Sequence, residues 1–271
     1  MEFELFLKLA VIGDPIAHSA SPQFQRGFLD EAGVAGSYEA LRVPAGGGAR
    51  AIADLRAKGY RGLNVTTPLK EEALLACERV PDPLAMLADS VNVVLFQNDG
   101  TYGFNTDGFG ALYSIADAMR RDDETRAATE LNGVRIAVLG VGPTARAAIA
   151  HLKERGANVS VWNRTRERGE AAAERFGVGL WNGSPVDVVF STLPPQAEIE
   201  DAVVEAARTV PIVIDANYGP RTTLADRLGR SVIDGLGMLK HSALASFRLF
   251  SMPRSERIED VDHDAGPWLD A

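Results

Sequence analysis

The chain has 271 residues, of which 46% are apolar, so it can bury a full hydrophobic core and is long enough for two domains of ordinary size. Its 28 basic and 37 acidic residues give a formal net charge of −9, which argues against non-specific binding to nucleic acid or to an anionic membrane. Cys77 is the single cysteine, which excludes an internal disulfide, and no Cys/His cluster in the sequence suggests a metal site.

Two further features concern the location of the protein. No run of about 18 apolar residues occurs, and we therefore predict no membrane span. Residues 1–10 are apolar but carry Glu2 and Glu4 in place of a basic segment, so we predict no signal peptide. The expected location is the cytoplasm.

Short apolar runs alternate with helical patterns through the first half of the chain, which indicates an α/β fold. We expect strands at residues 8–13, 37–43, 61–66, 90–96 and 101–104, helices at 23–32, 49–58, 71–77 and 109–119, and a short helix after Pro83. The Asn-Asp-Gly sequence at residues 98–100 predicts a hairpin between the last two strands. Ser21 before Pro22 is typical of a helix N-cap.

Two polar corners precede helices in this half. Lys70 lies where the third predicted strand gives way to a helix, and Asp107 lies between the fifth strand and the helix that follows it. Functional side chains of α/β sheets gather at such corners. For Asp107 the alternative is a structural helix N-cap.

From residue 134 strand and helix alternate again, and parallel β-α-β winding is the economical interpretation. We expect strands at 134–139, 158–162, 178–181, 186–191, 211–215 and 231–233, and helices at 145–155 and 238–251. The charged segment 121–132 is interpreted as the surface connection into this half. The acidic last 20 residues are expected to fray.

The clearest chemical signal is the end of the first strand in this half. It runs into Gly140-Val141-Gly142, and a helical pattern follows, as in a dinucleotide-binding turn. Gly140 permits the tight turn and Gly142 lets the backbone approach a pyrophosphate, while the N–H groups that open the helix attract the anion. Ala145 occupies the third glycine position, where alanine is accepted, and Pro143 suits the first helical turn.

The residue that reads the ribose is expected about twenty residues later, at the end of the next strand. There the chain continues with Asn163-Arg164-Thr165-Arg166-Glu167-Arg168, with no Asp or Glu at the strand tip. An acidic residue would bind the 2′-hydroxyl of NAD, whereas arginine would pair with a 2′-phosphate. We therefore predict NADP(H) as the cofactor. The alternative is that these arginines form only the solvated start of a helix.

Several stretches, taken in order, resemble the shikimate dehydrogenase family, and the resemblance spans residues 8 to about 250. In the first half they are VIGDPIAHSASP (11–22), NVTTPLK (64–70), SVN (90–92) and GFNTDG (103–108). In the second half they are GVG (140–142), NRT (163–165), DANY (215–218) and DGLGML (234–239). Each motif is modest, but their conjunction is highly specific.

The resemblance implies the reduction of 3-dehydroshikimate by NADPH, with Lys70 as the catalytic acid/base and Asp107 as its partner. Hydride addition to a ketone leaves an alkoxide that needs a proton from a nearby cation, so a lysine suits this role. By the same resemblance the substrate carboxylate is assigned to Ser19, Ser21 and Tyr218, and the ring hydroxyls to Thr66, Asn92 and Asp107. The implied cofactor residues are Gly140, Val141, Gly142, Pro143, Thr144, Ala145, Asn163, Arg164, Thr165, Arg168, Ala216 and Gly235.

Three departures from the family pattern bear on these roles. Pro143 and Thr144 replace the usual glycine and alanine, which removes one N–H donor and adds a hydroxyl. Ser242 replaces a glutamine that commonly contacts the substrate, and its shorter side chain predicts weaker substrate binding. Near the expected nicotinamide, the loop at 191–196 is shorter than usual and Ala216 replaces a residue that is frequently bulkier.

We therefore expect an α/β protein of two domains. Residues 1–106, completed by the C-terminal helix at 238–271, would form a substrate-binding domain, and residues 107–237 a Rossmann-type doubly wound NADP-binding domain. The leading hypothesis is a shikimate dehydrogenase of aromatic amino acid biosynthesis that works on a small molecule as a monomer or homodimer. The alternatives are a paralogue that uses quinate or an aminoshikimate, and a sensor that binds NADP without a redox step.

Overall fold

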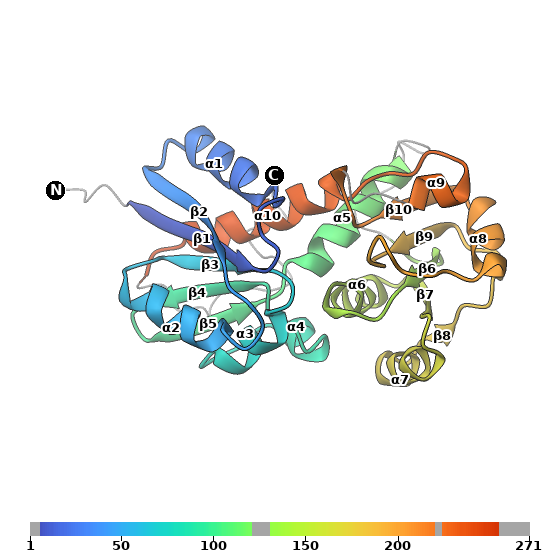
Figure 1. Cartoon of the computed structure of the whole chain (residues 1–271), viewed down its shortest axis with the longest axis horizontal. Coiled ribbons are helices and arrows are strands. Elements are labelled where there is room, and N and C mark those ends of the chain that lie inside the picture. The colour runs from blue at the N-terminus through green and yellow to red at the C-terminus, as the bar shows by residue number, and fades with distance from the viewer. Residues whose placement is uncertain (1–5, 121–130, 220–223, 255–271) are drawn as a thin grey trace. The chain divides into compact units, whose positions relative to one another are not determined.

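The computed structural model describes residues 6–120, 131–219 and 224–254 (Figure 1). These residues form two compact units, each with its own five-stranded sheet. The first unit contains the described residues up to Thr106 and those from Ser242 onward, and the second contains the described residues from Asp107 to His241. The connection predicted at 121–132 and the C-terminal segment predicted to fray lie almost wholly outside the described residues.

The sheet of the first unit has the strand order β2-β1-β3-β4-β5 (Figure 1). Its strands are β1 (Leu7–Gly13), β2 (Gly36–Arg42), β3 (Gly62–Val65), β4 (Val93–Gln97) and β5 (Gly100–Phe104). β1 pairs in parallel with β2 and β3, whereas β4 runs antiparallel to β3 and β5. Every residue of β3, β4 and β5 is buried, as expected for strands that are covered on both faces.

Helices cover both faces of this sheet. They are α1 (Ser21–Glu31), α2 (Gly48–Ala57), α3 (Lys70–Ala76), α4 (Pro83–Leu87) and the C-terminal part of α10 (Leu236–Ser251). Because side chains alternate along β1, Leu9 shares a core cluster with Leu29 of α1 and Phe250 of α10, whereas Ile12 shares one with Leu55 of α2. The sheet therefore separates two hydrophobic cores.

Local predictions in this unit are partly corrected. The hairpin at 98–100 is confirmed, since Gln97 pairs with Gly100, but β4 begins at Val93 and not at residue 90. The prediction of Ser21 as an N-cap is wrong, because α1 begins at Ser21 and its N-cap residue is Ala20. The hydroxyl that satisfies this helix start belongs to Ser19, whose Oγ accepts the backbone N–H of Ser21 at 3.3 Å.

The sheet of the second unit has the order β10-β9-β6-β7-β8, and all of its strand pairs are parallel. Its strands are β6 (Arg135–Leu139), β7 (Asn158–Trp162), β8 (Gly179–Leu180), β9 (Val188–Ser191) and β10 (Ile212–Asp215). The chain passes from β6 through β7 to β8 and then continues on the other side of β6 with β9 and β10. This doubly wound topology reverses direction between β6 and β9 and confirms the predicted Rossmann-type sheet.

The described helices of the second unit are α5 (Asp107–Arg120), α6 (Pro143–Glu154), α7 (Arg166–Phe176), α8 (Asp201–Arg208) and α9 (Leu224–Leu228), and α10 begins here. The prediction of a strand at 231–233 is wrong, because only Ile233 pairs with β10, through Ile214. After α9 the chain turns at Gly229, with φ of +62°, and beyond Ile233 it leaves the sheet, where the N–H of Gly235 donates to the carbonyl of Asn217 before α10 begins at Leu236. None of the helices in the described residues combines the length and apolar character needed to cross a membrane.

Candidate active site

The predicted cofactor residues gather at one edge of the second sheet. The strands β6, β7, β9 and β10 end in register with one another. Their carboxyl ends flank the reversal of strand order, which is where parallel α/β sheets bind ligands. The first residues beyond these strands are Gly140, Asn163, Thr192 and Ala216.

The glycine turn after β6 is closed on one side and open on the other. Gly140 has φ of +104°, and a Cβ there would lie 2.7 Å from Oγ1 of Thr192, so only glycine fits without strain. Its N–H donates to the carbonyl of Trp162 at 2.8 Å, which ties the turn to β7. Gly142 is the N-cap of α6, and a Cβ there would meet nothing within 4 Å. The backbone is therefore accessible at Gly142, as the approach of a pyrophosphate requires.

The first turn of α6 follows at once. Pro143 is its first residue, as predicted for a position whose N–H has no helical partner. Thr144 turns its hydroxyl toward α5 and donates from Oγ1 to Oδ2 of Asp107 at 3.1 Å. Ala145 is fully buried, which agrees with the close packing of helix on strand expected at the third glycine position. Val141 is half-buried within the turn.

The predicted ribose-reading residues lie just beyond β7. Asn163 stabilises this loop, since its Nδ2 donates to the carbonyl of Thr165 at 2.8 Å. Arg164 and Arg168 are exposed, and within the described chain neither forms an ion pair. Arg166 differs, because it pairs with Glu170 at 2.8 Å. The guanidinium of Arg164 thus remains available to an anionic ligand.

A cavity of about 360 Å³ borders this loop. Its lining includes the apolar residues Val161, Trp162, Leu180 and Trp181 together with Asn163 and Arg164, while Glu200 adds one carboxylate. An apolar wall with a nearby guanidinium suits an aromatic base that carries a phosphate.

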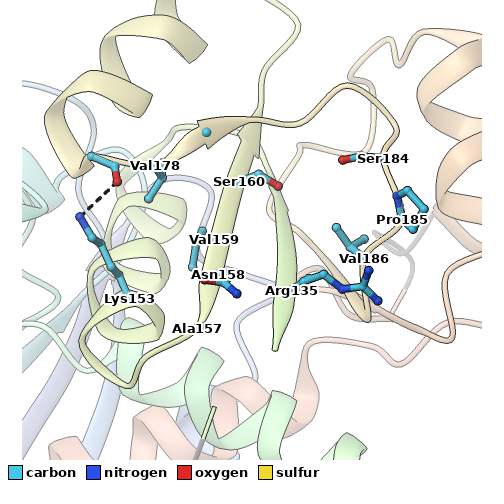
Figure 2. Close-up of a pocket in the computed structure, with 12 residues that line it drawn as sticks. Arg135, Lys153, Ala157, Asn158, Val159, Ser160, Val178, Ser184, Pro185 and Val186 are labelled. Carbon is cyan, nitrogen blue, oxygen red and sulfur yellow. Dashed lines mark hydrogen bonds between the residues drawn. The ribbon is translucent and has the colours of Figure 1, made fainter. Parts of the chain in front are cut away.

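A second cavity, of about 390 Å³, lies at the opposite edge, near the starts of β6 and β7 (Figure 2). Its two cations already have protein partners. Arg135 pairs with Asp187 at 2.7 Å. Lys153 donates to the carbonyl of Gly177 at 3.3 Å (Figure 2). This cavity is therefore a poor candidate for a phosphate-bearing ligand.

Ala216, which is predicted near the nicotinamide, contacts Gly235, another predicted cofactor residue. A Cβ on Gly235 would lie 2.1 Å from the carbonyl oxygen of Ala216, so glycine allows this close approach. The N–H of Gly235 donates to the carbonyl of Asn217 at 2.9 Å, and Nδ2 of Asn217 donates to the carbonyl of Leu193 at 2.7 Å. These bonds join the segments after β9 and β10 to the start of α10. Tyr218 follows Asn217 and is half-buried.

In the first unit, the predicted substrate residues follow the carboxyl ends of β1 and β3. The two loops are joined by a hydrogen bond from the N–H of Asp14 to the carbonyl of Thr67 at 2.9 Å. Ser19 and Ser21 lie in the first loop and at the start of α1, and Thr66 lies in the second. All three side chains are at least half-buried. Because β1 and β3 pair in parallel up to Ile12 and Val65, the loops that carry them begin at the same edge of the sheet.

Lys70 is the first residue of α3 and only 7% of its surface is exposed. Its carbonyl accepts the N–H of Val91 at 3.1 Å, which places the backbone of Asn92 next to it along the chain. A helix dipole disfavours a cation at the N-terminus, so helix stability does not explain a lysine here.

Asn92 belongs to a buried polar network in the first unit. Its Oδ1 accepts the N–H of Thr106 at 2.7 Å, and its Nδ2 donates to Oγ1 of Thr106 at 3.1 Å. Ser242, brought in by α10, lies 2.9 Å from the same Thr106 hydroxyl and accepts weakly from Asn92 at 3.5 Å. Ser242 thus supports Asn92 through Thr106, a contact that its shorter side chain allows.

Sequence reasoning gave Thr106 no role, although it lies within the polar corner before α5. It also missed a second buried network, in which Asn64 accepts from Tyr38 at 2.7 Å and from Gln25 at 3.5 Å. Burial raises the pKa of Tyr38 well above its usual value, so its hydroxyl stays a donor. A signal existed, because Asn64 is polar within an otherwise apolar strand.

The fold and these residues define a class: an α/β protein of two units whose second sheet carries a dinucleotide-binding turn at its reversal point. The family described as "Shikimate dehydrogenase substrate binding domain" matches residues 11–94, and "Shikimate / quinate 5-dehydrogenase" matches residues 123–217. Together with the relatives below, these matches show that the chain belongs to the shikimate dehydrogenase family. The predicted family is confirmed.

Similar proteins cover nearly the whole chain. The shikimate dehydrogenase (NADP(+)) of Gluconobacter oxydans is 36% identical over 259 residues, with 89% of each chain covered. That of Methanosarcina acetivorans is 32% identical over 264 residues, with 89% of this chain and 91% of the relative covered. The crystal structure of a shikimate 5-dehydrogenase from Thermus thermophilus in complex with NADP(H) and shikimate is 32% identical, with a TM-score of 0.75, and the match covers 90% of this chain and 93% of that one.

Proposed function

We propose that the chain is an NADP-dependent shikimate dehydrogenase, which reduces 3-dehydroshikimate to shikimate reversibly in aromatic amino acid biosynthesis. The observation that carries the proposal is the carboxyl edge of the second sheet. There the open turn at Gly142 and the guanidinium of Arg164, which forms no ion pair among the described residues, follow neighbouring strands, and the tip of β7 carries no carboxylate. Membership of a family whose relatives are named for NADP(+) supports the same cofactor.

The residues at this edge fit NADP(H). We assign the pyrophosphate to the turn and first helical residues Gly140, Val141, Gly142, Pro143, Thr144 and Ala145. The N–H groups of this first turn lack helical acceptors, carry partial positive charge and suit an anion. We assign the 2′-phosphate end to Asn163, Arg164, Thr165 and Arg168, and the nicotinamide end to Ala216 and Gly235. When bound, NADPH supplies the hydride.

We assign to Lys70 the donation of the proton that completes the reduction of the ketone. As a ketone becomes an alcohol its oxygen gains negative charge, and an ammonium can both stabilise that charge and donate the proton. Asp107 is proposed to accept a hydrogen bond from the reacting hydroxyl and so to orient it. In the reverse direction the neutral amine of Lys70 takes the proton back.

The polar residues of the first unit are proposed to hold the substrate. Ser19 and Ser21, with Tyr218, would bind the carboxylate through hydroxyl donors, which add no further charge. Thr66 and Asn92 would bind ring hydroxyls, and Ser242 would act beside Asn92. We propose that the protein works as a monomer or homodimer, which sedimentation analysis would distinguish.

A paralogue that uses quinate or an aminoshikimate is the second candidate, and it is favoured by Ser242 in place of the usual glutamine. A sensor without redox activity is the third. It is disfavoured because Lys70 and Asp107 are both present, and a binding protein needs neither a proton donor nor its partner.

The test measures initial rates from NADPH absorbance with shikimate or quinate and with NADP⁺ or NAD⁺. We expect the highest kcat/KM for shikimate with NADP⁺. Lys70→Met should lower kcat by about 10²- to 10⁴-fold, the usual contribution of a general acid, whereas Lys58→Met alters an exposed lysine and serves as the matched control. Higher efficiency with quinate and NAD⁺ would favour the paralogue, and NADPH binding without turnover of either substrate would favour the sensor.

A further inference from the structure

A hydrogen bond links the proposed cofactor turn to the proposed catalytic carboxylate inside the second unit. Oγ1 of Thr144 donates to Oδ2 of Asp107 at 3.1 Å. Asp107 is the first residue of α5, and Thr144 is the second residue of α6. Only 8% of the surface of Asp107 is exposed, so this contact is shielded from water.

The close approach of the two helices makes this contact possible. At Gly108, next to Asp107, a Cβ would lie 2.4 Å from the carbonyl oxygen of Ala147 and 2.1 Å from Nδ1 of His151. Glycine therefore lets the backbone of α5 lie directly against α6. The first turn of α5 is thereby held within reach of a short side chain on the first turn of α6.

Thr144 can act on two groups at once because its backbone and side chain point to different partners. Its backbone N–H belongs to the first helical turn, which lacks helical acceptors and suits a phosphate. Its hydroxyl is turned to the carboxylate. A hydrogen bond to a carboxylate is stronger than one between neutral groups and fixes the plane of the acceptor.

We propose that Thr144 is a positioning residue, whose hydroxyl holds Asp107 in the orientation that binds the reacting hydroxyl of the substrate. This inference rests on the proposed function, because it assumes that Asp107 serves the substrate. Since the same residue lies in the cofactor turn, it also ties the placement of Asp107 to the turn that takes the pyrophosphate. The competing interpretation is that the hydroxyl serves the pyrophosphate itself.

The two interpretations differ in which ligand is affected. Thr144→Val keeps the size and branching of the side chain but removes the donor, and Thr144→Ser keeps the donor. Thr209→Val is the matched control, because Thr209 is an exposed threonine of the same unit whose hydroxyl bonds only locally, to the carbonyl of Ala206. The measurements are kcat and KM for shikimate at saturating NADP⁺, and the Kd of NADPH from its fluorescence without shikimate.

We expect Thr144→Val to lower kcat/KM for shikimate about tenfold or more, the usual effect of losing a hydrogen bond to a charged group, while the Kd of NADPH changes by less than about twofold. Thr144→Ser should recover most of the loss. Weaker NADPH binding with unchanged shikimate kinetics would overturn the proposal in favour of the phosphate. Equal losses in Thr144→Val and Thr144→Ser would reduce Thr144 to a packing role.

Failure of the proposed function would be visible separately, as a wild-type protein that does not turn over shikimate. The bond itself is then tested without turnover, by the urea midpoints of Thr144→Val, Asp107→Ala and the double variant, since alanine leaves no side-chain acceptor. Non-additive shifts would support the positioning contact, and additive shifts would overturn it.

Discussion

Gly140 and Gly142 lie in one turn, but substitution by alanine should lower stability at Gly140 and cofactor affinity at Gly142. At Gly140, a φ of +104° costs a residue with a Cβ about 1–3 kcal/mol, and the new Cβ would lie 2.7 Å from Oγ1 of Thr192. Thr192 donates from that oxygen to the carbonyl of Leu139 at 3.1 Å, so moving it sacrifices a further bond worth about 0.5–1.5 kcal/mol. Gly140→Ala should therefore lower the free energy of unfolding by about 1.5–4.5 kcal/mol.

Gly142→Ala should leave that free energy within about 0.5 kcal/mol of the wild type, because the residue has φ of −69° and open space where its Cβ would lie. The same Cβ would occupy the side open to the pyrophosphate, and NADPH binding should weaken by about tenfold or more. Urea denaturation gives the stability of both variants, and NADPH fluorescence titration gives the affinity. If Gly142→Ala bound NADPH as tightly as the wild type, the open side of the turn would not face the cofactor and the reasoning would fail.

Three further changes probe other parts of the chain. Arg61→Met should lower the free energy of unfolding, measured by urea denaturation, by about 2–4 kcal/mol, because this buried guanidinium donates to two backbone carbonyls at the end of α10. Arg50→Met, which alters an exposed arginine, is the control. A decrease below about 1 kcal/mol for Arg61→Met would contradict this expectation. Ser242→Gln should raise kcat/KM for shikimate by roughly 2- to 13-fold if glutamine gains one substrate hydrogen bond, and no rise would show that the contacts of Ser242 suffice. Burial, followed by the charge of Glu78, raises the pKa of Cys77 from 9.0 to about 12. The buried neutral thiol of Cys77 therefore contributes fully to stability below pH 9, and this contribution is lost as pH rises toward 12. Near pH 8, labelling of the thiol should be about a thousandfold slower in the native protein than in the unfolded protein. Equal labelling rates would refute the effect of burial.

The sequence allowed the sheet and the cofactor turn to be predicted because their signals are local. Apolar runs that end in Gly140 or Asn163 determine where strands stop, and parallel winding brings those ends to one edge. The segment 231–233 is also predicted as a strand from its apolar residues, but it does not form one. The backbone meets β10 only at Ile233, because the chain turns at Gly229 before it and leaves the sheet at Gly235, whose N–H donates to the carbonyl of Asn217. These turns and contacts are not visible in the apolar pattern.

Contacts between side chains distant in sequence could not be predicted in this way. Thr144 and Asp107 are 37 residues apart, and their bond depends on the backbone approach at Gly108. Thr106 and Ser242 are separated by 136 residues, so nothing local indicates that Ser242 supports Asn92. The hydroxyl of Thr144 was visible as a departure from the family pattern, but its partner required the packed helices.

The position of Ser242 also depends on the far end of α10. In the first unit, Nε2 of Gln25 donates to the carbonyl of Ala243 at 2.9 Å, next to Ser242, and Arg61 donates to the carbonyl of Phe250 at 3.1 Å. Two buried side chains from earlier in the chain therefore hold the helix at both ends of its packed segment. Asn92 gains its Ser242 contact only when this last helix is in place, so the residues proposed to bind the substrate in the first unit are completed by the last helix that the structure describes. Substitution of Arg61, although it is remote from Asn92, should therefore shift α10 and weaken the hydrogen bonds among Asn92, Thr106 and Ser242.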